Sequence, residues 1–240
     1  MGFLKNGVTA HRGNSVQLPE NTMLAFISAI SIAVDWIEAD IRETADGKLV
    51  VIHDDNTKRL ATHNLSIKNV TYAELKAIDI AHQFRYTNQL TTEQCPKLSI
   101  PLLSDVINLM KSQGLTKTQH FTRLSIHPKV DCIDQTIQLI ENMNAAIWVG
   151  FNDSNWENLR RIRAWNSEIP VFWDRPADND INNDIETAKK LGIKKLSIET
   201  GTGEFFLPAR KLFKVCGFEK CKPFSHYKED PNSCYMSLNL

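Results

Sequence analysis

Short apolar runs with strand character alternate with longer runs of helical periodicity along most of this 240-residue chain. Parallel strands are joined by crossovers of a dozen or more residues, usually a helix, so this alternation indicates a parallel sheet covered by helices. At this length it favours an α/β fold of the (β/α)8 TIM-barrel type, with a doubly wound sheet as the alternative. The strands expected before residue 200 cover residues 7–10, 36–41, 49–52, 124–126, 146–151, 170–173 and 195–198.

The expected helices are marked by apolar spacing and by the residues at their ends. Asn21-Thr22 precedes an apolar helix over residues 23–34, and Pro101 opens a helix that runs to Met110. A turn at residues 45–48 joins two of the strands as a hairpin. Residues 55–100 are less regular. Further helices are expected over residues 72–78, 132–143, 156–165, 181–191 and 208–215.

Composition excludes several classes of protein. The chain has 28 basic and 28 acidic residues, so no basic excess indicates a nucleic acid or an anionic membrane as partner. No apolar stretch approaches the roughly 20 residues of a transmembrane helix, and Met1–Thr9 is too short for a secretory signal before His11. Five cysteines without framework spacing indicate reduced thiols. We therefore expect a cytoplasmic protein, and the composition does not define its oligomeric state.

Polar residues stand where several expected strands end, which is where the catalytic groups of a barrel lie. Glu38 and Asp40 are two residues apart, so on a strand both face the same side. Two such carboxylates repel each other unless a cation or a proton lies between them, and Mg²⁺ or Ca²⁺ would resolve this. They could instead be solvent-facing acids on an edge strand.

Two histidines also stand at strand ends, His11 after the first strand and His53 after the third. Each alone could be an ordinary histidine, in a loop or in the core. Together with the two carboxylates they indicate a metal and an acid/base pair at one end of the sheet. That combination suits cleavage of a phosphate ester.

Five short motifs occur in order in the first sixty residues. They are Ala10-His11-Arg12-Gly13, Pro19-Glu20-Asn21-Thr22, Ile37-Glu38-Ala39-Asp40, Thr44-Ala45-Asp46-Gly47 and His53-Asp54. This pattern resembles the glycerophosphodiester phosphodiesterase family. The resemblance implies a (β/α)8 barrel and a phosphoric diester hydrolase of lipid metabolism. Such an enzyme uses a divalent cation to hydrolyse glycerophosphodiesters, which are small-molecule phosphodiester substrates, to glycerol 3-phosphate and an alcohol.

The resemblance also implies a role for each matching position. The general base and general acid would be His11 and His53, and the metal ligands would include Glu38 and Asp40. The phosphate would bind Arg12 and Lys129, and Glu20 would support the site.

One site position departs from the family pattern. The family usually has a glutamate two residues before the lysine, as a further metal ligand, and here that residue is His127. Mg²⁺ or Ca²⁺ remains the expected ion, but an imidazole would shift the preference towards Mn²⁺ or Zn²⁺ if it binds the metal. His127 could instead only line the pocket. An alternative function is therefore a catalytically impaired barrel that binds phosphate esters without turnover. A related alternative is another phosphodiester lyase on the same barrel, such as one that acts on lysophospholipids.

The end of the chain resembles a different family. The C-terminal end of GNAT-type N-acetyltransferases is similar to five segments here: Glu199-Thr200-Gly201, residues 208–213, Cys216-Gly217-Phe218, Pro223-Phe224 and residues 227–236. Acetyl transfer does not follow, because nothing upstream resembles that family's glycine-rich pyrophosphate loop.

We therefore expect two regions, a phosphodiesterase-like barrel over residues 1–198 and an acetyltransferase-like tail over residues 199–240. A helix over residues 204–215 and a strand over residues 218–224 would let the tail complete the barrel in an atypical last βα unit. The alternative is a barrel that does not close and leaves an exposed edge.

Overall fold

The computed structural model describes residues 8–115, 121–174, 180–190, 192–224 and 229–240. The chain divides into two compact units, the first of which ends at Asp174. Each unit has its own sheet and its own cluster of buried apolar side chains. No helix in these described ranges is long and apolar enough to cross a membrane.

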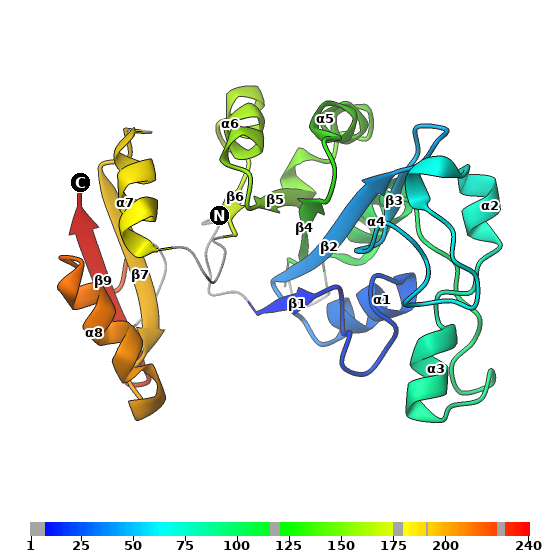
Figure 1. Cartoon of the computed structure of the whole chain (residues 1–240), viewed down its shortest axis with the longest axis horizontal. Helices are drawn as coiled ribbons and strands as arrows, with labels where there is room; N and C mark the ends of the chain where they lie inside the picture. The colour runs from blue at the N-terminus through cyan, green and yellow to red at the C-terminus, as the bar shows by residue number, and fades with distance from the viewer. Residues whose placement is uncertain (1–7, 116–120, 175–179, 191, 225–228) are drawn as a thin grey trace. The chain divides into compact units, whose positions relative to one another are not determined.

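A six-stranded sheet with parallel neighbours forms the centre of the first unit (Figure 1). Its main path runs in the order β1-β2-β4-β5-β6, and β3 pairs antiparallel with β2. The helices between the parallel strands make this a half-barrel of the (β/α)8 type, which confirms the expected α/β fold class. The strands are β1 (Thr9–His11), β2 (Trp36–Glu43), β3 (Leu49–Val51), β4 (Arg123–Pro128), β5 (Val149–Asp153) and β6 (Val171–Trp173).

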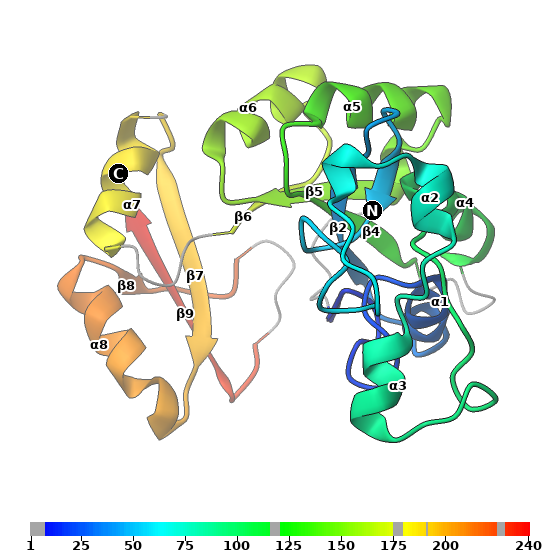
Figure 2. The same ribbon diagram turned by 45° about the vertical axis from the view of Figure 1, so that its right-hand side comes forward.

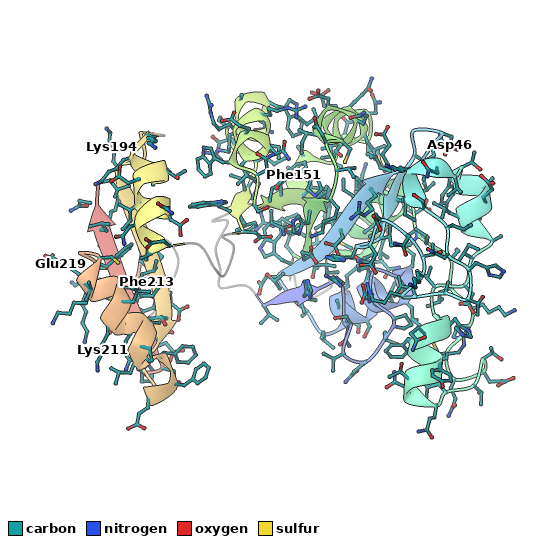
Figure 3. The ribbon with its side chains drawn as sticks, viewed as in Figure 1. Asp46, Phe151, Lys194, Lys211, Phe213 and Glu219 are labelled. Atoms are coloured by element: carbon teal, nitrogen blue, oxygen red, sulfur yellow. The ribbon has the colours of Figure 1, made fainter. Side chains whose placement is uncertain are left out.

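Apolar helix faces cover this sheet, and its central strands are therefore buried on both sides. Every residue of β2 from Trp36 to Ile41 is buried, and so is every residue of β5. Phe151 of β5, labelled in Figure 3, is fully buried among the strands and helices of the first unit. The main helices of this unit are α1 (Met23–Ser31), α4 (Leu103–Gln113), α5 (Ile133–Asn142) and α6 (Trp156–Trp165).

Residues 55–100 hold more structure than their pattern indicates. The expected short helix is present as α2 (Tyr72–Lys76), and a further helix, α3 (His82–Asn88), was not expected. Only Arg85 of α3 is buried, so the helix has no apolar stripe to reveal it in the sequence. Arg85 instead pairs with Asp79 and donates to the backbone carbonyls of residues 95 and 96. The remaining short helices are η1 (Ile67–Asn69) and η2 (Ala146–Trp148).

The second unit contains a three-stranded antiparallel sheet in the order β7-β9-β8. Figure 2 shows α7 and α8 beside this sheet. Phe213 of α8 packs against the unit's buried cluster, which includes Phe218 and Met236. The elements are α7 (Ile181–Lys190), β7 (Lys195–Gly201), η3 (Glu204–Phe206), α8 (Leu207–Val215), β8 (Glu219–Lys220) and β9 (Ser233–Asn239).

The first compact unit ends at Asp174. In the second unit, β7 pairs along its whole length with β9, from Lys195 opposite Asn239 to Gly201 opposite Ser233. The division into a phosphodiesterase-like barrel over residues 1–198 and an acetyltransferase-like tail over residues 199–240 stays a prediction. The strand expected over residues 218–224 is only β8, two residues long, and its partner is β9. Completion of the barrel by the tail stays a prediction. Gly7, expected in the first strand, lies outside the described residues.

Replacement of Gly13 by alanine should destabilise the first unit. Gly13 has a φ of +81°, and an added Cβ would lie 2.8 Å from the Cβ of Ala25 and 2.9 Å from its carbonyl carbon. Backbone strain and this clash together should lower the free energy of unfolding by about 2–4 kcal/mol. Urea unfolding of Gly13→Ala would measure the loss.

The matched control is Gly47→Ala. Gly47 also has a positive φ, +72°, but the nearest atom to an added Cβ is 3.8 Å away, on Glu43. Only the backbone strain remains there, about 1 kcal/mol. Equal losses at the two glycines would mean that the contact with Ala25 costs nothing.

Candidate active site

The parallel register of three strands assembles the polar residues that the motifs identified. Glu38 of β2 stands beside His11 of β1 on one side and Ser125 of β4 on the other. Asp40, two residues further along β2, stands beside His127 of β4. The carboxyl ends of parallel strands meet at one edge of the sheet, so these side chains gather there. Ile37, Ala39 and Ile41 alternate with the two acids and join the apolar core.

A cavity of about 390 Å³ opens at this edge. Its lining residues belong to β1, β2, β4, β5 and β6 or directly follow β4 and β6, all in the first unit. The mixture of charged, imidazole and small polar groups makes it a site for a charged ligand. Its lining residues are Thr9, His11, Glu38, Ser125, His127, Lys129, Asn152, Phe172 and Asp174.

Glu38, Asp40 and His127 fit a cation. Each offers one ligand atom, and the three atoms lie within 4.8 Å of one another. Nδ1 of His127 is 3.4 Å from Oε1 of Glu38 and 3.7 Å from Oδ1 of Asp40. Oε1 of Glu38 is buried and has no hydrogen-bond partner among the described residues. A buried carboxylate oxygen without a partner is costly, and a bound cation would remove that cost.

Two permanent cations and an amide hold Asp40 in place. Nε of Arg12 is 3.0 Å from Oδ2 of Asp40, and Nζ of Lys129 is 3.0 Å from Oδ1. Nδ2 of Asn21 donates to Oδ2 at 2.9 Å. Burial opposes ionisation of Asp40, but the hydrogen bond from Asn21 and the charges of Lys129 and Arg12 outweigh it. The pKa of Asp40 is therefore below its usual range.

Glu20 connects Arg12 to a second arginine. Oε1 of Glu20 accepts from Nη1 of Arg12 at 3.0 Å, and its two oxygens accept from Arg59 at 2.6 and 2.8 Å. Burial raises the pKa of Glu20, but the hydrogen bonds and charges of Arg59 and Arg12 together lower it by more, so the net shift is downward. Glu20 is thus an ionised bridge between the loop after β1 and the loop after β3.

Arg59 continues this network to His53. Its Nε donates to Oδ2 of Asp54 at 2.6 Å, and Oδ1 of Asp54 lies 2.7 Å from Nδ1 of His53. The carbonyl of His53 also accepts from Nε of Arg42 at 2.8 Å. The contacts of Arg59 with Glu20 and Asp54 raise its pKa further above neutrality. The ring of His53 is therefore held at one nitrogen.

The structure places the two expected acid/base histidines differently. His11 lines the cavity with a side chain that is 66% exposed, and its Nε2 is 3.8 Å from Oε2 of Glu38. His53 is connected to the site through Asp54, Arg59 and Glu20, and the described cavity lining does not include it.

Sequence reasoning assigned no role to several residues that the structure brings into this network. Asn21 belongs to a motif, and its positive φ of 53° and near-complete burial show that its amide serves Asp40. Asp54 stands next to His53 in the sequence, which was the available signal. Arg59 carries no spacing signal, because it reaches the site from a loop whose path the sequence does not reveal. Asp174 directly follows the strand expected over residues 170–173, and that position was the available signal.

A parallel α/β sheet with carboxylates, imidazoles and cations at its carboxyl edge is the arrangement of a (β/α)8-barrel active site. The sequence profile of the Glycerophosphoryl diester phosphodiesterase family matches residues 11–200. The chain therefore belongs to this family, as its motifs indicated.

Individual relatives agree with this membership. The chain is 40% identical over 107 residues to a glycerophosphodiester phosphodiesterase of Bacillus altitudinis, a match that covers 45% of this chain and 41% of the relative. It is similar to a phosphodiesterase structure from Oleispira antarctica, with a TM-score of 0.62, 24% identity, and coverage of 78% of this chain and 72% of the other. The matches cover about two-fifths to two-thirds of the length of the first curated relatives.

A separate match concerns the second family that the tail resembles. The chain is 52% identical over 56 residues to an uncharacterized N-acetyltransferase of Bacillus subtilis. That match covers 23% of this chain and 37% of the relative, which agrees with an acetyltransferase-like tail.

Replacement of Glu20 by glutamine should destabilise the protein at neutral pH. The change leaves Arg12 and Arg59 without their shared carboxylate, and a partly buried network of this kind should lose about 1–3 kcal/mol. The pKa of Glu20 is lowered in the folded state, so its stabilisation is present above the pKa of the unfolded chain and is lost as the pH falls through the folded value. The difference in the free energy of unfolding between wild type and Glu20→Gln should therefore become smaller in acid.

Urea unfolding at neutral pH and in acid would test this prediction. Glu157→Gln is the control, because Glu157 pairs with Arg160 on the surface of α6 and should matter little. A difference in the free energy of unfolding that stays constant with pH would contradict the role of Glu20 as an ionised bridge between Arg12 and Arg59.

Proposed function

We propose that this chain hydrolyses glycerophosphodiesters to glycerol 3-phosphate and an alcohol. The observation that carries the proposal is the cluster of Glu38, Asp40 and His127 beside His11, Arg12 and Lys129, assembled by the register of three strands. Membership of the family supports it. So does the structural neighbour from Oleispira antarctica, which is described in complex with the product sn-glycerol-3-phosphate.

Glu38, Asp40 and His127 would hold a divalent cation. Mg²⁺ or Ca²⁺ suits the two carboxylates, whereas the imidazole favours Mn²⁺ or Zn²⁺. When bound, the cation would stabilise the negative charge that grows on the phosphoryl oxygens during attack.

Arg12 and Lys129 would bind the phosphate of the substrate. Both already point their charged ends at Asp40, 3.0 Å away in each case. Glu20 holds Arg12 from its other side, so the guanidinium is oriented before a substrate arrives. Donors fixed in advance stabilise developing charge without reorganisation during the reaction.

His11 and His53 would move the protons. An imidazole accepts and donates a proton near neutral pH, which suits a base for the nucleophile and an acid for the leaving alkoxide. Asp54 holds Nδ1 of His53 at 2.7 Å and leaves Nε2 for proton transfer. His11 stands on the exposed rim of the cavity next to Glu38.

A second candidate function is binding of phosphate esters without turnover. His127 favours it, because the imidazole supplies no negative charge where a carboxylate would hold the cation more strongly. We also propose a cytoplasmic location, because the five cysteines form no disulfide.

Hydrolysis of glycerophosphocholine should require an added divalent cation. The assay would compare Mg²⁺, Ca²⁺, Mn²⁺ and Zn²⁺ after treatment of the protein with a chelator, and would measure glycerol 3-phosphate. Product in the presence of at least one ion, and none with the chelator, is the expected result. Binding of glycerol 3-phosphate with no product under any condition would favour the second candidate. Comparison with a lysophospholipid substrate would separate the two phosphodiester classes.

His11→Ala and His53→Ala should each lower kcat by about 10²- to 10⁴-fold, the usual contribution of a general acid or base. His63→Ala is a suitable control, because His63 is exposed and its ring forms a hydrogen bond with its neighbour Thr62, away from the site network. Steady-state kinetics at saturating metal would measure kcat for the three variants and test this prediction. A rate for either catalytic variant equal to that of His63→Ala would remove that histidine from the mechanism.

A further inference from the structure

Asp174 is a carboxylate in the cavity that no motif assigns. It follows β6 directly, and its backbone N–H donates to the carbonyl of Asp153 at 2.9 Å, which extends the pairing of β5 and β6 by one residue. Its side chain lines the cavity and is 46% exposed. Nδ2 of Asn152 donates to its Oδ2 at 2.7 Å and so restrains the carboxylate. Ser125 in turn donates to the amide oxygen of Asn152 at 2.8 Å, so the amide is itself oriented.

Three carboxylate oxygens converge on one ring nitrogen. Oδ2 of Asp174 lies 3.6 Å from Nδ1 of His127, almost as near as Oε1 of Glu38 at 3.4 Å and Oδ1 of Asp40 at 3.7 Å. These oxygens come from β2 and from the end of β6, on opposite sides of β4 in the sheet order. Anionic groups gathered in this way repel one another unless positive charge lies among them. Lys129 supplies one positive charge, with its Nζ 3.0 Å from Nδ1 of His127 and 3.0 Å from Oδ1 of Asp40, against three carboxylates.

Asp174 increases the negative charge available to such a cation. Glu38 and Asp40 are balanced by the permanent charges of Arg12 and Lys129, and His127 adds none when neutral. Asp174 makes the site negative overall. Oε1 of Glu38, buried and without a hydrogen-bond partner in the described ranges, is an independent sign of a missing cation.

We propose that Asp174 is a further ligand of the divalent cation, and that its carboxylate supplies the negative charge that His127 does not. The inference rests on the cation site of the proposed function. Asn152 then has the role of holding the ligand, as hydrogen-bonded partners of metal-binding carboxylates do.

Metal binding, rather than activity, tests this inference. Titration calorimetry would measure the Kd for Mn²⁺ of the whole chain after removal of metal by a chelator. We expect Asp174→Asn to raise that Kd by about tenfold or more. In the double variant His127→Glu/Asp174→Asn, a carboxylate on β4 replaces the lost charge and should restore most of the affinity. The rescue also shows that a chain that carries Asp174→Asn can fold, and urea unfolding of the single variant would show that it is folded as well.

Asp131→Asn is the matched control. It removes the same charge from a surface position, where Asp131 pairs with Arg161 outside the cavity, and should leave the Kd unchanged. If the wild type binds Mn²⁺ and Asp174→Asn binds it with the same Kd, the inference about Asp174 is wrong, whereas the cation site of the proposed function stands. A loss that His127→Glu does not recover would also overturn it. A wild-type chain that binds none of Mn²⁺, Mg²⁺ or Ca²⁺ would overturn the cation site itself.

Discussion

The parallel register of β1, β2 and β4 is the constraint on which the rest of this site depends. It sets His11, Glu38 and Ser125 in one row and Asp40 and His127 in the next. A shift of one residue would turn both carboxylates into the apolar layer formed by Ile37, Ala39 and Ile41. Burial of that layer therefore holds the polar row at the cavity. The stability of the core and the geometry of the site have the same cause.

Charge balance explains why so many ionic groups can lie together at one edge of the sheet. Glu20 is shared by Arg12 and Arg59, and Arg59 reaches Asp54 beside His53. Glu20, Asp40 and Asp54 are each stabilised by a neighbouring cation in this network, and the pKa of each is therefore lowered. The network joins loops that are far apart in the sequence, so it also orders the rim of the cavity.

Much of this arrangement could be predicted because local pattern and tertiary structure agree. Alternation of strands and helices indicated the parallel sheet, and the two-residue spacing of Glu38 and Asp40 placed both on one face. The helix α3 escaped prediction because its buried residue is the charged Arg85, which no hydrophobic period reveals. The pairing of β7 with β9 also escaped prediction, since it joins residues that are 32 to 44 positions apart, from Gly201 with Ser233 to Lys195 with Asn239.

The sequence by itself determined the fold class, the family and the residue types of the site, because each depends on periodicity or on short motifs whose members are close in the chain. Only the tertiary structure decided which of those residues meet. Asp174 is separated from Glu38 by more than a hundred residues, yet both approach His127 because β2 and β5 flank β4 and β6 follows β5 in the sheet. Strand order is set by long-range burial of apolar surface, which no local pattern encodes.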